Sequence, residues 1–162
     1  MQTFVPITDS HEHIAQVLDN KRLNKQALEG WQILMTLLEL DPNGDHRKPK
    51  GWVNHPAVKM WRGHEIALHR YIIAMVAEWK RRGYKSTIGE KATATINKAL
   101  ELGILPQESS NPMWMSCYDT YKEIASSHRT ALLSKEYEWY SQFKWPEDPG
   151  HRPETYEYIW PE

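Results

Sequence analysis

The sequence is poor in cysteine and in uninterrupted apolar stretches. Its 162 residues include one cysteine, Cys117, which excludes an internal disulfide and a metal site built from several cysteines. Charged residues or histidine interrupt the apolar runs every few residues, so we expect no segment that crosses a membrane. The first ten residues, MQTFVPITDS, lack the basic start and apolar stretch of a secretory signal. We therefore expect a cytoplasmic protein.

The chain also has little net charge. It carries a formal charge of −1 and has a pI near 6.7, which argues against a protein that coats nucleic acid. Hydrophobic residues make up 40% and charged residues 25%, as in ordinary soluble domains. We expect a single domain that spans residues 1–162.

Aromatic residues are abundant but unevenly distributed among types. The chain has eight Trp and eight Tyr but only two Phe. Trp and Tyr combine an apolar ring with a polar edge, which suits half-buried surfaces, base stacking and cores. From the sequence alone, each of these rings can either pack in the core or stack on a base.

Apolar residues spaced three and four apart predict an all-α fold. Asp9 or Ser10 can cap the first helix, and further helices are expected to begin near residues 23, 56, 90 and 117. The helix that begins near residue 56 is expected to be the longest. It should end at Gly83, and Gly63 could introduce a kink in it. After Glu136 the helical pattern disappears, and we expect an irregular aromatic tail that packs on the helices.

Positive charge is concentrated in three places despite the low net charge. On a helix, Arg22, Lys25, Gln26 and Glu29 share one face, with Lys21 at its edge. This face can hold phosphates, or it can be a solvated surface with ordinary ion pairs. The segments HRKPK at 46–50 and KRRGYK at 80–85 are two more basic clusters.

Histidine spacing does not indicate a metal site. His64 and His69 are five residues apart and do not share a helix face. We expect no metal, and His55, His64 and His128 are more typical of hydrogen-bonded packing residues.

Several segments in a fixed order carry a family resemblance. VLDNKRLNKQ is followed by NHPAVKMWRGHE, AEWKRRGY, SHRTALL and EWYSQFKW. In this order the segments resemble the pyrimidine dimer DNA glycosylase family, in the bacterial and phage branch related to the endonuclease V enzymes. The resemblance extends over nearly the whole chain.

The resemblance implies a monomeric enzyme without a cofactor that binds double-stranded DNA and flips a nucleotide out of the helix. In this family the terminal α-amine attacks C1′ of the sugar and forms an imine, and cleavage of the strand can follow. A glutamate in the first basic helix assists. A free α-amine has an ordinary pKa near 8, so a useful fraction is nucleophilic at neutral pH.

Three positions of the family's site carry other residues in this sequence. Lys21 and Lys25 fall where the family has arginines that grip phosphates, whereas Arg22 falls where it has the catalytic glutamate. A cation cannot accept a proton or stabilise a positively charged imine, so we expect Glu29 to replace the missing acid.

The expected catalytic residues also include the start of the chain. Gln2 is too large to favour removal of Met1, which places the Met1 amine near the nucleophile's position. The candidate catalytic residues are Met1, Gln2, Arg22 and Glu29. The candidate DNA-binding residues are Lys21, Arg22, Lys25, Gln26, Lys48, Lys50, Trp139 and Tyr140.

Trp139 and Tyr140 are carried over from the family's aromatic terminal segment, and packing is the alternative for both. We expect a DNA glycosylase, with strand cleavage as a second activity, that removes a damaged or modified base. One alternative is a non-catalytic binder of distorted or modified DNA, and another is a helical domain that acts on a different phosphorylated ligand.

Overall fold

The computed structural model describes residues 1–105 and 110–162, and within them the chain forms eight α-helices and no β-strand. The predicted all-α fold is confirmed. The α-helices are α1 (His11–Val17), α2 (Asn20–Leu38), α3 (Pro56–Lys59), α4 (Glu65–Arg81), α5 (Ile88–Glu101), α6 (Met113–Ser116), α7 (Tyr118–Lys135) and α8 (Tyr137–Tyr140). Two 3-10 helices, η1 (Gly51–Asn54) and η2 (Ser141–Phe143), complete the set.

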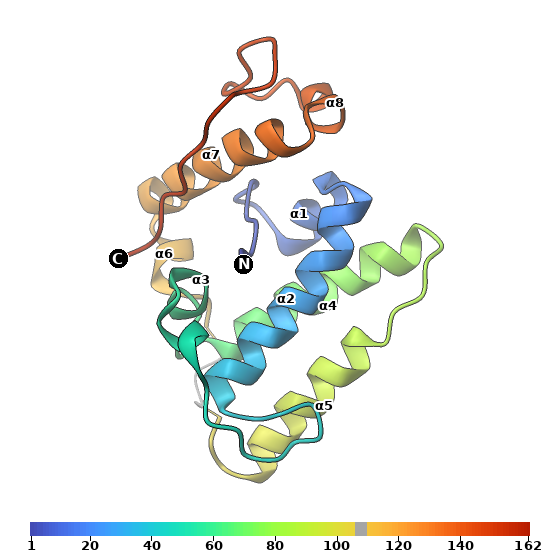
Figure 1. Ribbon diagram of the computed structural model, residues 1–162, viewed down its shortest axis with the longest axis vertical. Helices are drawn as coiled ribbons and strands as arrows, with labels where there is room; N and C mark the ends of the chain where they lie inside the picture. The colour runs from blue at the N-terminus through green and yellow to red at the C-terminus, as the bar shows by residue number, and fades with distance from the viewer. Residues whose placement is uncertain (106–109) are drawn as a thin grey trace.

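Helices α2 and α4 form the centre of the fold, and α1 and α5 pack beside them (Figure 1). Gly30 allows the close approach of α2 and α4, because a Cβ at this position would lie 2.7 Å from Cγ1 of Ile72. The core between these helices includes the fully buried side chains of Leu23, Leu34 and Leu68. Burial of such side chains is the main stabilising contribution to a fold of this kind.

The start of α1 follows the cap that its sequence predicts. The Oγ atom of Ser10 accepts a hydrogen bond from the backbone N–H of His13 at 3.1 Å, which satisfies one of the free donors at the helix start. Helix α2 begins directly after Asp19, and its end at Glu39 adopts a left-handed conformation with φ of 55°.

The expected long helix after Pro56 is two helices, so that prediction was wrong in this detail. Helix α3 ends at Lys59, and α4 begins at Glu65 after a turn in which Gly63 has a φ of 81°. A carboxylate oxygen of Glu65 accepts a hydrogen bond from the Gly63 N–H at 3.2 Å. The positive φ and this contact interrupt the helix where the sequence indicated only a kink.

The first residues of the chain lie buried between α2 and α7. The backbone N–H of Val5 donates to Nδ1 of His128 at 2.9 Å, and Arg129 donates to the carbonyl of Pro6 at 2.9 Å. Burial lowers the pKa of His128 to about 3, so this ring is neutral and can accept the hydrogen bond. These contacts hold the start of the chain in one position.

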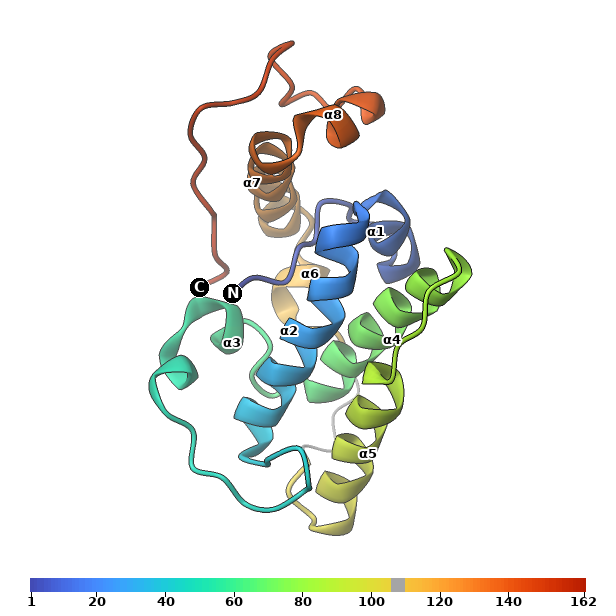
Figure 2. The ribbon, with the colours of Figure 1, turned by 45° about the vertical axis from the view of Figure 1, so that its right-hand side comes forward.

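The last residues return along α7 and end near the start of the chain. The side chain of Lys135 lies 5.0 Å from the ring of Tyr156, and the N–H of Ile159 donates to Oγ of Ser127 at 3.1 Å. Both views place the two ends of the chain beside α3 (Figures 1 and 2). The predicted aromatic tail, packed on the helices, is confirmed, but it is not irregular from its start, because α8 and η2 cover residues 137–143.

Across the described ranges, 1–105 and 110–162, no helix combines the length and apolar character that a membrane span requires.

Candidate active site at the start of the chain

A pocket of about 370 Å³ lies between the basic face of α2, the first residues, the end of α7 and the tail. Its lining residues are Met1, Gln2, Phe4, Lys21, Arg22, Lys25, Gln26, Glu29, Lys135, Tyr156 and Tyr158. We call it the amine pocket, because it contains the start of the chain. It brings together all four candidate catalytic residues, and the predicted common face of Arg22, Lys25, Gln26 and Glu29 is confirmed.

Gln26 connects the first residues to α2. Its Oε1 accepts hydrogen bonds from the N–H of Phe4 at 2.7 Å and from the hydroxyl of Tyr71 at 2.8 Å. Its Nε2 donates to the carbonyl of Gln2 at 3.0 Å and to Oε2 of Glu29 at 3.4 Å. The side-chain amide therefore has all its hydrogen-bonding capacity used within the protein.

This network corrects the expectation that Gln26 contacts DNA. The residue is 2% exposed, so it positions the start of the chain rather than presenting its amide to a ligand. Tyr71, which is fully buried, supports Gln26 from the other side, and burial raises the pKa of its phenol. A neutral phenol is the donor that this arrangement needs.

Glu29 lies next to the terminal residues. The backbone N–H of Gln2 donates to Oε2 of Glu29 at 3.4 Å, so the carboxylate is one residue away from the terminal amine. The pKa of His55 is lowered by burial and then by the positive charge of the terminal amine. The terminal amine is therefore close enough to His55 to act on its charge, and the residue that follows the amine is hydrogen-bonded to Glu29.

The cations of the amine pocket divide into two kinds. The guanidinium of Arg22 lies 3.2 Å from the carboxylate of Asp19 and 3.7 Å from that of Glu136. Lys21, Lys25 and Lys135 form no salt bridge within residues 1–105 and 110–162. The ammonium groups of Lys21 and Lys25 are consequently available for an anion such as a phosphate, whereas that of Lys135 lies 5.0 Å from the ring of Tyr156.

Lys48 and Lys50 are not part of this pocket. They are exposed on the loop before α3 and line a separate hollow of about 280 Å³ together with Trp52.

The tail residues Trp139 and Tyr140 also lie outside the amine pocket. Tyr140 is fully buried; its hydroxyl donates to Oδ1 of Asp19 at 2.5 Å and accepts from the Asp19 N–H at 3.1 Å. Trp139 is half-buried and donates to the carbonyl of Val17 at 2.8 Å. The expectation that Tyr140 stacks on a base is therefore corrected, and the packing alternative describes both side chains in this structure.

Sequence reasoning missed four lining residues: Phe4, Lys135, Tyr156 and Tyr158. The segment TYEYIW does contain a signal, because its aromatic residues occur at every second position, which in an extended chain places them on one face. Nothing in the sequence indicated where that face would lie.

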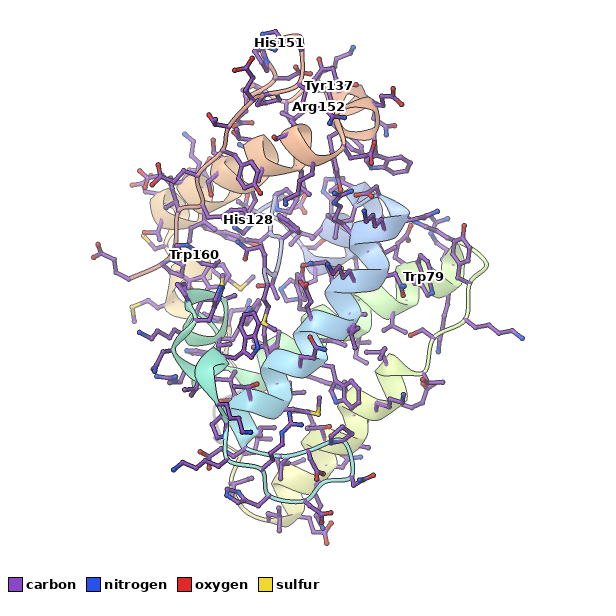
Figure 3. The ribbon with its side chains drawn as sticks, in the orientation of Figure 1. Trp79, His128, Tyr137, His151, Arg152 and Trp160 are labelled. Carbon is purple, nitrogen blue, oxygen red and sulfur yellow. The ribbon has the colours of Figure 1, made fainter. Side chains whose placement is uncertain are left out.

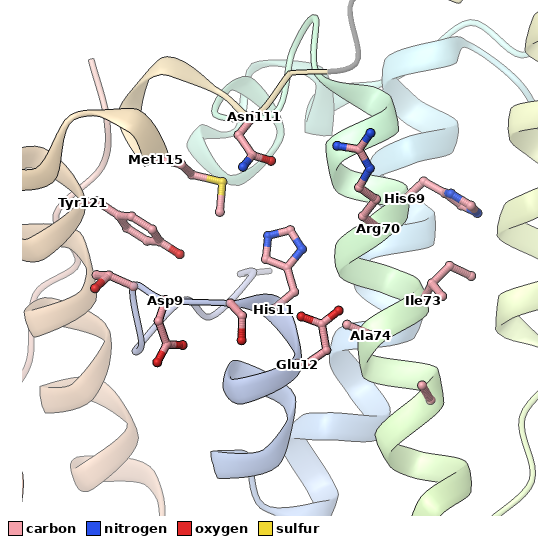
Figure 4. Close-up of a pocket in the computed structure, with 13 residues that line it drawn as sticks. Asp9, His11, Glu12, His69, Arg70, Ile73, Ala74, Asn111, Met115 and Tyr121 are labelled. Carbon is pink, nitrogen blue, oxygen red and sulfur yellow. The ribbon is translucent and has the colours of Figure 1, made fainter.

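A larger cavity of about 570 Å³ opens on the other side of Tyr71, between α1, α4 and α6. Figure 4 shows His11 pointing into it toward Asn111, with Arg70 and Tyr121 on opposite walls. Burial lowers the pKa of His11. Neither the terminal amine nor the basic face of α2 borders this cavity, so size alone does not identify the site.

A comparison to known families identifies the family of the chain. A family model described as pyrimidine dimer DNA glycosylase matches residues 1–90 of the chain. The chain belongs to the pyrimidine dimer DNA glycosylase family. The family acts on DNA, and all of α2, α3 and α4 lie within the matched range. No curated protein and no solved structure matches the chain.

Proposed function

We propose that this protein is a DNA glycosylase that excises a damaged or modified base through a covalent imine on the Met1 amine. The same imine would support cleavage of the strand at the resulting abasic site. The observation that carries the proposal is the 3.4 Å contact between the Gln2 N–H and Glu29 inside a pocket lined by basic residues. We treat residues 1–162 as one functional domain, because residues after the matched range line the same pocket.

In the first step, the lone pair of the neutral amine attacks C1′ of the sugar. The bond from C1′ to the base breaks, and its electron pair leaves with the base, which takes up a proton from water. The C1′–O4′ bond then opens as the C1′–N double bond forms, and the amine proton passes to O4′. The nearby carboxylate of Glu29 stabilises the resulting cation.

In the second step, Glu29 accepts a proton from C2′, and the electron pair expels the phosphate from C3′. Water then hydrolyses the imine and frees the amine. Lys21, Lys25 and Lys135 supply positive charge for the strand's phosphates. Gln26 is a positioning residue, because it holds Gln2 and Glu29 without contacting the reacting atoms.

Borohydride trapping tests the amine mechanism directly, because borohydride reduces an imine to a stable amine. The protein is treated with borohydride in the presence of a duplex with an abasic site, a UV-irradiated duplex or an undamaged duplex. We expect an adduct on the N-terminal peptide with the first duplex, and with the second if pyrimidine dimers are its substrate. A protein that binds the abasic duplex and gives no adduct would contradict the imine.

Substitution of Glu29 tests the role of the acid. In Glu29→Gln we expect strand cleavage to fall by roughly 100-fold or more, while the affinity for DNA stays similar. Glu39→Gln is a matched control, because it removes the same charge from the exposed end of the same helix. Equal cleavage by Glu29→Gln and the unmodified protein would exclude Glu29 as the acid.

A second candidate function is that of a non-catalytic binder of distorted or modified DNA. It is supported by Arg22, which occupies the position of the family's glutamate and lines the pocket. Salt-sensitive binding without an adduct or product for any duplex would favour this function.

A further inference from the structure

Five aromatic rings form a continuous series, and the last two of them line the amine pocket. Starting from η1, the order is Trp52, His55, Trp160, Tyr158 and Tyr156. Successive ring centres are 5.3, 5.9, 5.6 and 5.3 Å apart. We call this series the aromatic row. It joins two segments about one hundred residues apart in the sequence, the region around α3 and the end of the tail.

We propose that the aromatic row binds unpaired DNA nucleotides and holds a single strand beside the amine pocket. The ligand is single-stranded DNA, with its bases on the rings and its phosphates on the cations at both ends of the row. This proposal deepens the proposed function, because it predicts that the strand next to the excised base is unpaired. Its binding test does not depend on the amine chemistry.

The geometry of the rings leaves faces open for bases. The planes of neighbouring rings in the row are inclined by 54° to 88°, so neighbouring rings do not stack face to face. Trp79 and Tyr84 show the opposite arrangement, with ring centres 4.2 Å apart and planes inclined by 22°. A base can stack on an open face but not on one that another ring already covers.

The solvent exposure of the five rings differs between the ends and the middle of the row. Trp52 is 50% exposed and Tyr156 is 39% exposed, while the three rings between them are half-buried. The inner part of the row is anchored by Phe4, whose ring lies 6.3 Å from that of Tyr158. The inner rings are thus packed against the protein, and the rings at the two ends of the row are exposed to solvent.

Positive charge lies at both ends of the row. At one end, Arg47, Lys48 and Lys50 surround the hollow beside Trp52. At the other, the Lys135 ammonium lies 5.0 Å from the ring of Tyr156 and lowers the pKa of that phenol. A combination of aromatic rings and cations on one surface is typical of sites for single-stranded nucleic acid.

The acid between the two tyrosines does not face the row. Tyr156, Tyr158 and Trp160 contact one another at every second position, as side chains on one face of an extended chain do. Glu157 lies at the intervening position and is exposed. The tail therefore presents rings on one side and its carboxylate on another.

Members of the aromatic row also lie near the Met1 amine, which is the reacting group of the proposed mechanism. His55, its second member, is the ring whose pKa is lowered in part by the charge of the terminal amine. Tyr156 and Tyr158, its last members, line the amine pocket. A strand on the row would consequently keep its sugars close to the Met1 amine.

The experiment measures the affinity of the full chain for a labelled oligodeoxythymidylate and for an undamaged duplex of the same length, by fluorescence anisotropy. The test variant is Trp52→Ala, which removes an exposed ring outside the amine pocket. The matched control is Tyr84→Ala, which removes a 44% exposed ring next to lysines; its partner Trp79 lies on the opposite side of the molecule from Trp160 (Figure 3). Trp52→Phe keeps an aromatic ring.

We expect Trp52→Ala to weaken binding of the single strand by about five-fold to one hundred-fold, as loss of one stacked base does. Trp52→Phe and Tyr84→Ala should bind the single strand nearly as well as the unmodified protein, and duplex binding should change little. Tyr156→Ala, at the other end of the row, should weaken single-strand binding over the same range. Circular dichroism checks that each variant is folded.

Unchanged single-strand binding by both Trp52→Ala and Tyr156→Ala would overturn the proposal. An equal loss of single-strand and duplex binding would also overturn it, because the row would then not discriminate unpaired nucleotides. An absence of any borohydride adduct, together with normal single-strand binding, would instead contradict the proposed function and leave the row intact.

Discussion

The two halves of the aromatic tail use similar residues in opposite ways. In the first half, residues 136–145, Tyr140 is fully buried and its ring stacks on Trp145 with centres 5.6 Å apart. In the second half, residues 154–160, Tyr156 is 39% exposed and contacts its neighbour Tyr158 at an inclined angle of 54°. One half closes the core, and the other half lines the amine pocket.

The difference between the halves comes from their polar partners and their backbones. The Tyr140 hydroxyl pairs with both the N–H and Oδ1 of the buried Asp19, so its removal from the interior would take this partner from two buried polar atoms. The second half has no helix, and its alternating side chains lie on a surface. Aromatic content alone therefore does not separate a packing segment from a binding segment.

Replacement of Tyr140 is expected to have the largest effect on stability. Tyr140→Ala should reduce the free energy of unfolding by about 3–5 kcal/mol, because it removes a large buried ring. Tyr156→Ala should change it by about 0.5 kcal/mol or less, as is usual for a surface position. Urea denaturation measures both, and losses of similar size would break the distinction between the two halves.

A pH titration examines how the second half is anchored, because His128 contacts both Tyr158 and Val5. Burial lowers the pKa of His128 from 6.5 to about 3, so the unfolded chain binds this proton more readily than the folded one. Its contribution is complete above pH 6.5 and is lost as the pH falls from 6.5 toward 3. The loss approaches about 1.4 kcal/mol per pH unit.

The control for this titration is His128→Asn, whose side-chain oxygen can still accept from Val5. We expect its free energy of unfolding, measured by urea denaturation, to fall less between pH 6.5 and 4.5 than that of the unmodified protein. The pKa values of His11, His55 and His69 are also lowered, so part of the dependence should remain. Parallel pH profiles for the two proteins would contradict a neutral, buried His128.

Replacement of Trp139 is expected to have a smaller effect on stability than replacement of Tyr140. Trp139→Ala loses the hydrogen bond to Val17 and the contact with Arg82, whose guanidinium lies 5.8 Å from the ring centre. We expect a loss of about 1–2 kcal/mol in the free energy of unfolding and no change in DNA affinity. A loss of affinity at unchanged melting temperature would assign Trp139 to stacking and erase the contrast between the halves.

The helices and the basic face were predictable because their signals are local. Apolar spacing indicates a helix wherever it occurs, and Arg22, Lys25, Gln26 and Glu29 share a face through helical geometry alone. The interruption at Gly63 was less predictable, since a glycine permits a positive φ without requiring it.

Other features depended on contacts between distant segments. Gln26 looked like a surface residue of a basic face, but Phe4, Gln2 and Tyr71 use its whole amide. Tyr156 and Tyr158 carried the alternation of a one-sided extended segment, yet its place beside the chain's first residues follows from the return of the tail along α7.

The sequence by itself determined the all-α fold and the charged face of α2, because both follow from residues three and four positions apart. The tertiary structure decided which residues share the amine pocket, since the amine, the acid and the tail are brought together only because the first residues pack against both α2 and α7. Pairing of buried polar groups then placed Tyr140 inside the protein and left the rings near the end of the chain on its surface.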